Sequence, residues 1–200
     1  MIKAVFADRM TQIRALAAAG DNMALAVVAL FDSDYQSLVQ VVTPAAKSSN
    51  SVAATSYGDA ASNDITVAAS PAYPRNVRAV FGATWDGGNI VVTGTDQFDA
   101  AATETLVAVA NSTVVGTKVF KTVSSVAKTA VGVGLHGTNT VTVGTGDKLG
   151  LSVKSAQTVC LVGDSTPTAM TPTTYDPAVN GFTPANVPNG VLTYTVSVGV

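Results

Sequence analysis

Charged residues are scarce in this sequence. They make up 12% of its 200 residues, against about 25% in a typical soluble domain, while the hydrophobic fraction of 47% is ordinary. This hydrophobicity, combined with a net charge of only −2, excludes an intrinsically disordered chain. Copies of a protein with so little charge repel one another weakly. We therefore expect part of its surface to be buried in an assembly, and we expect the chain to form a homo-oligomer.

Basic residues are too few and too scattered to form a binding surface for polyanions. The 11 Lys and Arg residues are spread among 13 acidic ones, so no cluster could neutralise a run of phosphates or bind an anionic bilayer. The apolar run from Met23 to Phe31 is too short to span a bilayer, and residues 1–8 lack the pattern of a signal peptide. We expect no nucleic-acid partner, no membrane partner and synthesis in a cytoplasm.

The residue types that usually perform acid, base and nucleophilic chemistry are almost missing. Histidine, cysteine and glutamate occur once each, as His136, Cys160 and Glu104. A single cysteine cannot form an intrachain disulfide, and Cys160 lies in an apolar run where it is expected to be a small buried hydrophobe. His136 has no carboxylate or cysteine near it in sequence and is interpreted as an exposed loop residue. We expect no enzyme, no catalytic residue and no cofactor.

Asp96, Asp99 and Glu104 form the densest acidic cluster. Their oxygens could bind calcium, which takes six to eight oxygen ligands, but the Asp-rich loop of a typical calcium site is missing. Solvated acids near a turn are the favoured interpretation. We therefore expect no metal site.

The first 70 residues differ in pattern from the rest. Between Asp8 and Ala19 apolar residues recur at three- and four-residue steps, which predicts a helix, and the following run from Met23 is a second helix or a buried strand. Residues 46–70 are small and polar, which favours a linker or arm. We expect an N-terminal helical segment over residues 1–45, this linker, and a β domain over residues 71–200.

The β domain is indicated by short Val-, Ile-, Thr- and Phe-rich runs separated by Gly, Asp and Asn at spacings of about 8 to 12 residues. The segment Trp85-Asp86-Gly87-Gly88 predicts a tight hairpin between residues 76–84 and 89–95. Residues 192–200 alternate in the manner of a half-buried strand, and prolines predict a long loop over residues 165–190. The expected fold is mainly β: a single antiparallel β-sandwich, Ig-like or jelly-roll-like, with a short helical N-terminal segment.

Four short motifs stand out within residues 71–150 or so: Pro74-Arg-Asn, Trp85-Asp-Gly-Gly, Val92-Thr-Gly-Thr-Asp-Gln-Phe98 and Thr103-Glu-Thr105. In this order they resemble a β module of tailed-bacteriophage virion proteins. The resemblance implies a virion structural protein, made in the host bacterial cytoplasm: a head decoration or cement protein whose partner is the major capsid protein or another virion protein. A neck, tail or baseplate component and a carbohydrate-binding β-sandwich are the alternatives.

Aromatic side chains supply much of the buried area in cores and interfaces. The expected core or interface anchors are Trp85, Phe98, Phe120 and Tyr194, and Tyr175 and Phe182 are further expected interface residues. After Asp164 the only charged residue is Asp176, so residues 165–200 are predicted to form contact surface. The carbohydrate alternative requires exposed aromatics, for which the candidates are Tyr57, Tyr73, Trp85 and Tyr175.

Overall fold

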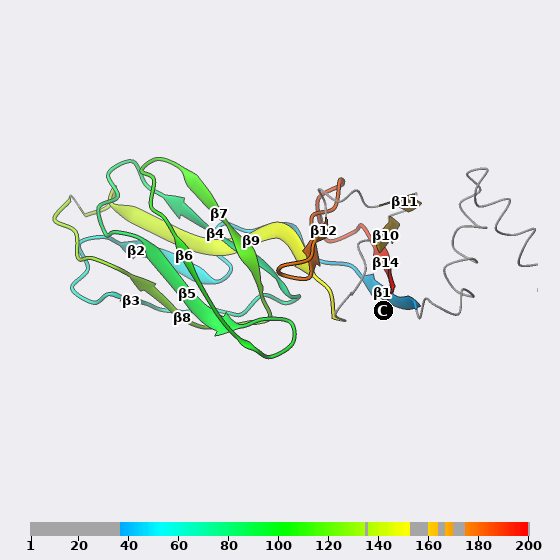
Figure 1. Ribbon diagram of the computed structural model, residues 1–200. Helices are drawn as coiled ribbons and strands as arrows, with labels where there is room; N and C mark the ends of the chain where they lie inside the picture. Colours follow the sequence, from blue (N-terminus) through cyan, green and yellow to red (C-terminus); the bar gives the residue numbers. More distant parts are fainter. Residues whose placement is uncertain (1–36, 135, 153–159, 164–166, 170–174, 200) are drawn as a thin grey trace, which may run out of the picture. The chain divides into compact units, whose positions relative to one another are not determined.

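The described part of the chain is built from β-strands. The computed structural model describes residues 37–134, 136–152, 160–163, 167–169 and 175–199, and these ranges contain no helix. Their strands form three sheets in which neighbouring strands are antiparallel (Figure 1). The prediction of a mainly β fold is confirmed. The helix expected between residues 8 and 19, and the apolar run at 23–31, lie outside the described residues.

Contacts along the chain divide it into two compact units. The first comprises Met1–Val42, Val153–Thr173 and Thr193–Val200, and the second comprises Thr43–Ser152 and Thr174–Leu192. Residues 71–200, which we expected to form one sandwich, therefore contribute to both units. A single sandwich is not confirmed.

The first unit contains a sheet of four strands. In sheet order they are β1 (Ser37–Val42), β14 (Tyr194–Gly199), β10 (Cys160–Gly163) and β11 (Pro167–Ala169). The predicted C-terminal strand is confirmed, and Tyr194 and Val196, two residues apart on one face of β14, are both buried. β1 pairs with β14 along its whole length. Residues 37–42, expected to belong to a helical segment, are thus a strand held by a distant partner.

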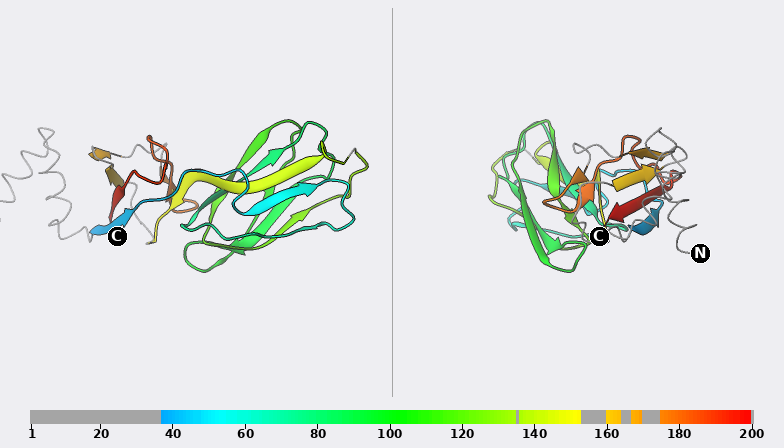
Figure 2. Two further views of the ribbon diagram at one scale, coloured as in Figure 1. Left: turned by 180° about the vertical axis from the view of Figure 1, so that it is seen from behind. Right: turned by 45° about the vertical axis from the view of Figure 1, so that its right-hand side comes forward.

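The second unit contains two sheets that lie face to face (Figure 2). In sheet order, the strands of the larger sheet are β12 (Tyr175–Asp176), β13 (Gly181–Phe182), β9 (Thr140–Gly150), β4 (Arg75–Phe81) and β7 (Thr113–Phe120). A sixth strand of this sheet, β2 (Ala53–Tyr57), also pairs with β9. In sheet order, the strands of the smaller sheet are β3 (Asp64–Ile65), β8 (Thr122–Lys128), β5 (Ile90–Thr95) and β6 (Ala101–Leu106).

Alternate side chains from both sheets meet in one hydrophobic core. Val77, Ala79 and Phe81 of β4 belong to it, as do Ile90 and Val92 of β5, and all five are buried. The spacing of two residues places them on one face of each strand. Burial of each Val, Ile or Phe side chain contributes roughly 1.5–3 kcal/mol, so this core is the main source of the unit's stability.

The predicted hairpin around Trp85-Asp86-Gly87-Gly88 is wrong. β4 pairs with β7 and β9, whereas β5 pairs with β6 and β8, so this segment crosses from one sheet to the other. A tight type I′ hairpin turn needs positive φ at two successive residues, and within the segment only Gly88 has one, at 74°. The buried Trp85 instead donates its Nε1–H to the carbonyl of Gly88 at 2.7 Å. The true hairpin joins β5 and β6.

Two segments predicted as irregular contain short strands. Residues 46–70, the expected linker, include β2 and β3, and the proline-rich residues 165–190 include β11, β12 and β13. Pro167 is the first residue of β11, a position that tolerates the missing N–H. β13 pairs with β9 through Phe182 and Leu149, both buried. Long-range pairing orders segments whose own composition favours loops.

Candidate functional site

The acids of the calcium alternative have separate structural roles. Asp96 accepts hydrogen bonds from two backbone N–H groups of its own turn, at 2.8 and 3.0 Å. Asp99, which has a φ of 63°, pairs with the exposed Lys121 at 2.8 Å. Glu104 extends from β6 to β7. Among the described residues, no three His, Cys, Asp or Glu side chains are grouped so that they could hold a metal ion.

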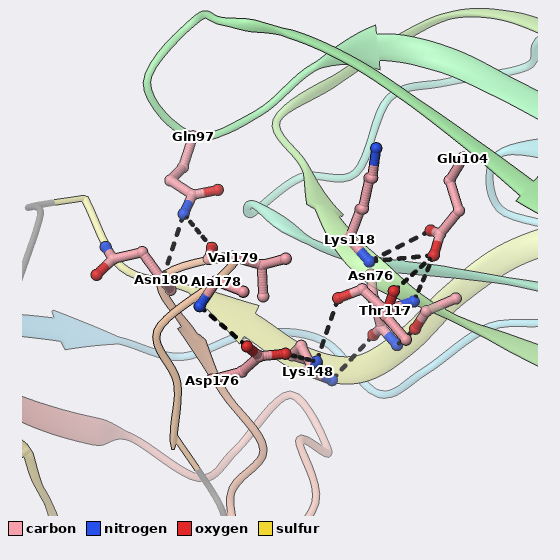
Figure 3. A network of polar contacts seen from close by, with 11 residues as sticks. Asn76, Gln97, Glu104, Thr117, Lys118, Lys148, Asp176, Ala178, Val179 and Asn180 are labelled. Atoms are coloured by element: carbon pink, nitrogen blue, oxygen red, sulfur yellow. Dashed lines mark hydrogen bonds and ion pairs between the residues drawn. The ribbon is translucent and has the colours of Figure 1, made fainter. Parts of the chain in front are cut away.

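Glu104 joins the edges of the two sheets of the second unit (Figure 3). Its carboxylate accepts hydrogen bonds from the backbone N–H of Thr117 at 2.6 Å, the Thr117 hydroxyl at 3.0 Å and the N–H of Lys118 at 3.2 Å. In return, Lys118 Nζ donates to the carbonyl of Thr103 on β6 at 2.7 Å. We call Glu104, Thr117 and Lys118 the edge clasp. Because open strand edges invite pairing with another chain, the clasp protects this edge.

A second network connects β4, β7, β9 and β12 (Figure 3). The buried Asn76 donates from Nδ2 to the carbonyl of Gly116 at 2.7 Å and accepts at Oδ1 from the N–H of Lys148 at 2.9 Å. Lys148 Nζ pairs with Asp176 at 2.8 Å. The hydrogen bond and charge of Lys148 hold the pKa of Asp176 below its ordinary value, against partial desolvation. This network fastens the proline-rich segment to the larger sheet.

Arg75, from the Pro74-Arg-Asn part of the resemblance, is buried. Its Nε donates to the carbonyl of Gly146 at 2.8 Å, Nη2 donates to the same carbonyl, and Nη1 donates to the carbonyl of Ala45 at 2.8 Å. Both ladders of β4 shift register beside this residue. A bulge leaves backbone groups without ladder partners, and the side chains of Arg75 and Asn76 satisfy several of them. The motif therefore has a structural role in this chain.

Two loops at one end of the second unit carry exposed valines. The β6–β7 loop (107–112) and the β8–β9 loop (129–139) both contact residues 82–84: the N–H of Asn111 donates to Gly82 at 3.0 Å, and the hydroxyls of Thr138 and Thr84 lie 2.8 Å apart. The exposed side chains, with their exposed fractions, are Val107 (62%), Val109 (52%), Val131 (49%) and Val133 (97%). We call these four residues the end valines.

Asp86 holds the β8–β9 loop. Its Oδ2 accepts hydrogen bonds from the N–H groups of Val133 and Gly134, each at 2.8 Å, and its Oδ1 accepts one from Asn139 Nδ2. Desolvation raises the pKa of Asp86, but the hydrogen bonds from Val133, Asn139 and Gly134 outweigh it and hold the pKa below its ordinary value. The backbone at Val133 is therefore fixed while its side chain stays in water.

Lys128 holds the neighbouring β2–β3 loop through hydrogen bonds to its backbone carbonyls. It is only 2% exposed, and its ammonium donates to the carbonyls of Tyr57 at 3.3 Å, Gly58 and Ala60. Desolvation lowers the pKa of Lys128, and the charges of two nearby aspartates oppose that shift. Both Lys128 and Asp86 were missed by the sequence analysis. For Lys128 the available signal was a charged residue at the end of a run that reads as a strand, Thr122–Lys128.

His136 lies in the same group of loops. Its Nδ1 is 3.0 Å from a carboxylate oxygen of Asp59, and its ring stacks on Tyr57 with 3.9 Å between centroids. The interpretation of His136 as an exposed loop residue is confirmed, although the carboxylate beside it comes from a distant part of the chain. The pair is solvent-facing and connects the β2–β3 and β8–β9 loops.

The expected aromatic anchors are mostly core residues. Trp85, Phe120, Tyr175, Phe182 and Tyr194 are buried within the chain itself, and Phe98 is half-buried. Buried residues offer little surface to a partner, so an interface has to use other side chains. Of the remaining aromatics considered for sugar stacking, Tyr57 already stacks on His136, and Tyr73, whose pKa is raised by burial, donates to the carbonyl of Gly150 at 2.8 Å.

Within the described residues, no helix is long and apolar enough to cross a membrane. A scan of protein-family models finds no match to the chain, and comparisons with curated proteins and with solved structures find none either. The relation to bacteriophage virion proteins therefore stays a prediction made from the sequence motifs.

Proposed function

We propose that this protein is a non-enzymatic structural component of a tailed-bacteriophage virion, a decoration or cement protein that stabilises the head by packing against the major capsid protein. The observation that carries the proposal is Val133, which is 97% exposed although Asp86 fixes its backbone. Covering one valine with a partner contributes roughly 1.5–3 kcal/mol. A loop that is already ordered loses little conformational entropy on binding.

The other end valines support the same function. Single exposed apolar side chains are common, but four on two adjoining loops make a surface of the kind that marks protein contacts. Val187 and Val191 are also 48% and 80% exposed, in the charge-poor region from residue 165 onward that we predicted as contact surface. The centres of protein interfaces are depleted in charge, which agrees with the composition of this chain.

The structural use of the acids supports a non-enzymatic function. Asp86, Asp96 and Glu104 accept hydrogen bonds from backbone N–H groups, and Asp99, Asp147 and Asp176 pair with lysines. Carboxylates that fasten loops and edges in this way are committed to stability. Packing against a shell requires no reactive group.

We also propose the finer features of the fold: an Ig-like or jelly-roll-like sandwich in the second unit, and a helical segment before residue 37. The chain crosses between the two facing sheets after β2, β3, β4, β6, β7 and β8, as sandwich topologies do. Far-UV circular dichroism of the full chain and of a version lacking residues 1–36 tests the helix. Equal helical signal from both proteins would contradict it.

Quantitative mass spectrometry of purified phage particles tests the proposed function. A head decoration protein is expected in copy numbers on the order of hundreds per particle, following the symmetry of the shell. A count of about a dozen or fewer would instead support the alternative of a neck, tail or baseplate component. Absence from the particles of the phage that encodes the chain would overturn both assignments.

A further inference from the structure

A pocket of about 180 Å³ lies beside the edge clasp in the second unit. The β5–β6 turn contributes Asp96 and Gln97 to its wall, β7 contributes Lys118 and Val119, and the turn between β12 and β13 contributes Val179. Pockets for drug-sized ligands measure roughly 300–1,000 Å³. This pocket is smaller and suits a single ring or a similar group.

Gln97 is the unusual residue of the pocket. It is only 9% exposed, and its amide oxygen accepts no hydrogen bond from the described residues while its amide nitrogen donates two. Its Nε2 donates to the carbonyls of Val179 at 2.7 Å and Asn180 at 3.2 Å, which fixes the side chain. Its Oε1 is buried and accepts no hydrogen bond within the described part of the chain. Figure 3 shows this oxygen directed away from those two carbonyls, toward the side where Lys118 lies.

An unused buried oxygen implies a missing donor. Leaving a buried acceptor unsatisfied costs roughly 1–3 kcal/mol, and folded proteins pair nearly all such atoms. Because two backbone carbonyls hold Nε2, the side chain cannot turn its oxygen elsewhere without losing those bonds. The position of Gln97 therefore favours a ligand that brings an O–H or N–H into the pocket.

The other polar groups limit the ligand further. The charges of Asp96 and Lys118 sum to zero, which favours a neutral ligand. Lys118 Nζ uses one donor on the carbonyl of Thr103, so two of its three donors stay available for an acceptor. The ligand must therefore donate to Gln97 and accept from Lys118 while resting apolar surface on Val119 and Val179.

We propose that this pocket binds a single saccharide ring. The several hydroxyl groups of the ring supply both functions: one donates to Gln97 Oε1 and another accepts from Lys118 Nζ. The C–H face of the ring covers Val119 and Val179. Since none of the pocket walls is aromatic, affinity depends on hydrogen bonds, and we expect a dissociation constant on the order of millimolar. The site does not depend on the proposed virion function.

An extended peptide is the competing ligand, because its amides are also neutral donors and acceptors. A peptide bound at this place would gain most by adding a strand to β6 or β7. The edge clasp occupies that position, with Glu104 on the N–H groups of Thr117 and Lys118. The geometry therefore favours the sugar.

NMR titration of the ¹⁵N-labelled full chain tests the proposal. The probes are glucose, galactose, mannose and N-acetylglucosamine, with N-acetylalanine methylamide as the peptide probe. At least one sugar is expected to shift the amides of Gln97, Lys118 and Val179 and to saturate in the millimolar range. The proposal would be overturned if the peptide probe alone shifted these amides, or if none of the probes shifted them.

Two variants and one control separate binding from folding. Gln97→Leu removes the acceptor and is expected to weaken sugar binding at least tenfold. Ala101→Leu fills the pocket with Gln97 intact and should abolish binding, which keeps the test valid should Gln97→Leu unfold. Asp99→Asn removes a nearby charge outside the pocket wall and should bind as the original protein does. Unchanged affinity in folded Gln97→Leu or Ala101→Leu would contradict the site.

Discussion

Replacing Lys128 with methionine is expected to lower the free energy of unfolding of the second unit by about 3 kcal/mol. The variant keeps the apolar stem but removes the donor to the carbonyls of Tyr57, Gly58 and Ala60. A buried carbonyl left without a donor costs roughly 1–3 kcal/mol. The Gly58 contact is buried and the other two are partly buried, so water can replace the donor at two of the three.

Urea unfolding followed by the fluorescence of Trp85 measures this loss. Trp85 is the sole tryptophan and is buried in the second unit, so its emission reports that unit. For a unit of this size, a loss of about 3 kcal/mol corresponds to a melting temperature lower by about 10 °C. The matched control is Lys47→Met, which removes an exposed ion pair with Asp147 and should change stability by less than about 0.5 kcal/mol. Equal stability of Lys128→Met and the original protein would refute the proposed role of the buried ammonium.

Three further predictions concern the clasp, a close contact and the loop anchor. Glu104→Ala should lower the free energy of unfolding, measured with urea, by about 1.5 kcal/mol, because charged acceptors contribute more than exposed ion pairs. Asp99→Asn removes only an exposed ion pair and keeps a side chain that tolerates the positive φ of this position, so it should change stability by less than about 0.5 kcal/mol. Gly94→Ala should lower the free energy of unfolding by about 3 kcal/mol, because the new Cβ would lie 1.9 Å from the carbonyl oxygen of Thr122. The melting temperature should fall accordingly, and an unchanged melting temperature would contradict the close approach. The pKa of Asp86 is lowered on folding, so its contribution is complete above the unfolded pKa and is lost as pH falls through the folded pKa. The amide resonance of Val133 should then titrate with a midpoint below the ordinary aspartate range, and a midpoint within that range would count against the anchor.

The sequence predicted strands better than it predicted their partners. The alternation in residues 192–200 identified β14 because burial of one face imposes a period of two. It could not identify β1 as the partner, since pairing between residues 37–42 and 194–199 depends on contacts across the whole chain. The error at Trp85-Asp86-Gly87-Gly88 has the same origin. Asp-Gly permits a tight turn, but the buried indole of Trp85 and the bonds to Asp86 favour a crossing between sheets.

The candidate site was accessible to sequence reasoning only in part. The scarcity of charge predicts contact surface, which stays a prediction, and five of the six aromatic residues expected in the core or at an interface are buried within the chain itself. The hydrogen bonds of Asp86, Lys128 and Gln97 were not foreseen, because each joins residues from different strands or turns. Nothing in the local pattern separates a solvated aspartate from one that fixes a loop more than 40 residues away.

Protection of Val133 on intact particles tests the central claim most directly. In a Cys160→Ser background, Val133→Cys provides a single thiol, and Ser125→Cys provides a control on an exposed position of β8. Maleimide labelling is measured for the free protein and for the protein bound to particles that lack the original copy. We predict that particle binding slows labelling at position 133 at least tenfold and leaves position 125 unaffected. Equal labelling of position 133 in both states, or failure of the protein to bind particles, would contradict a packing function for the end valines.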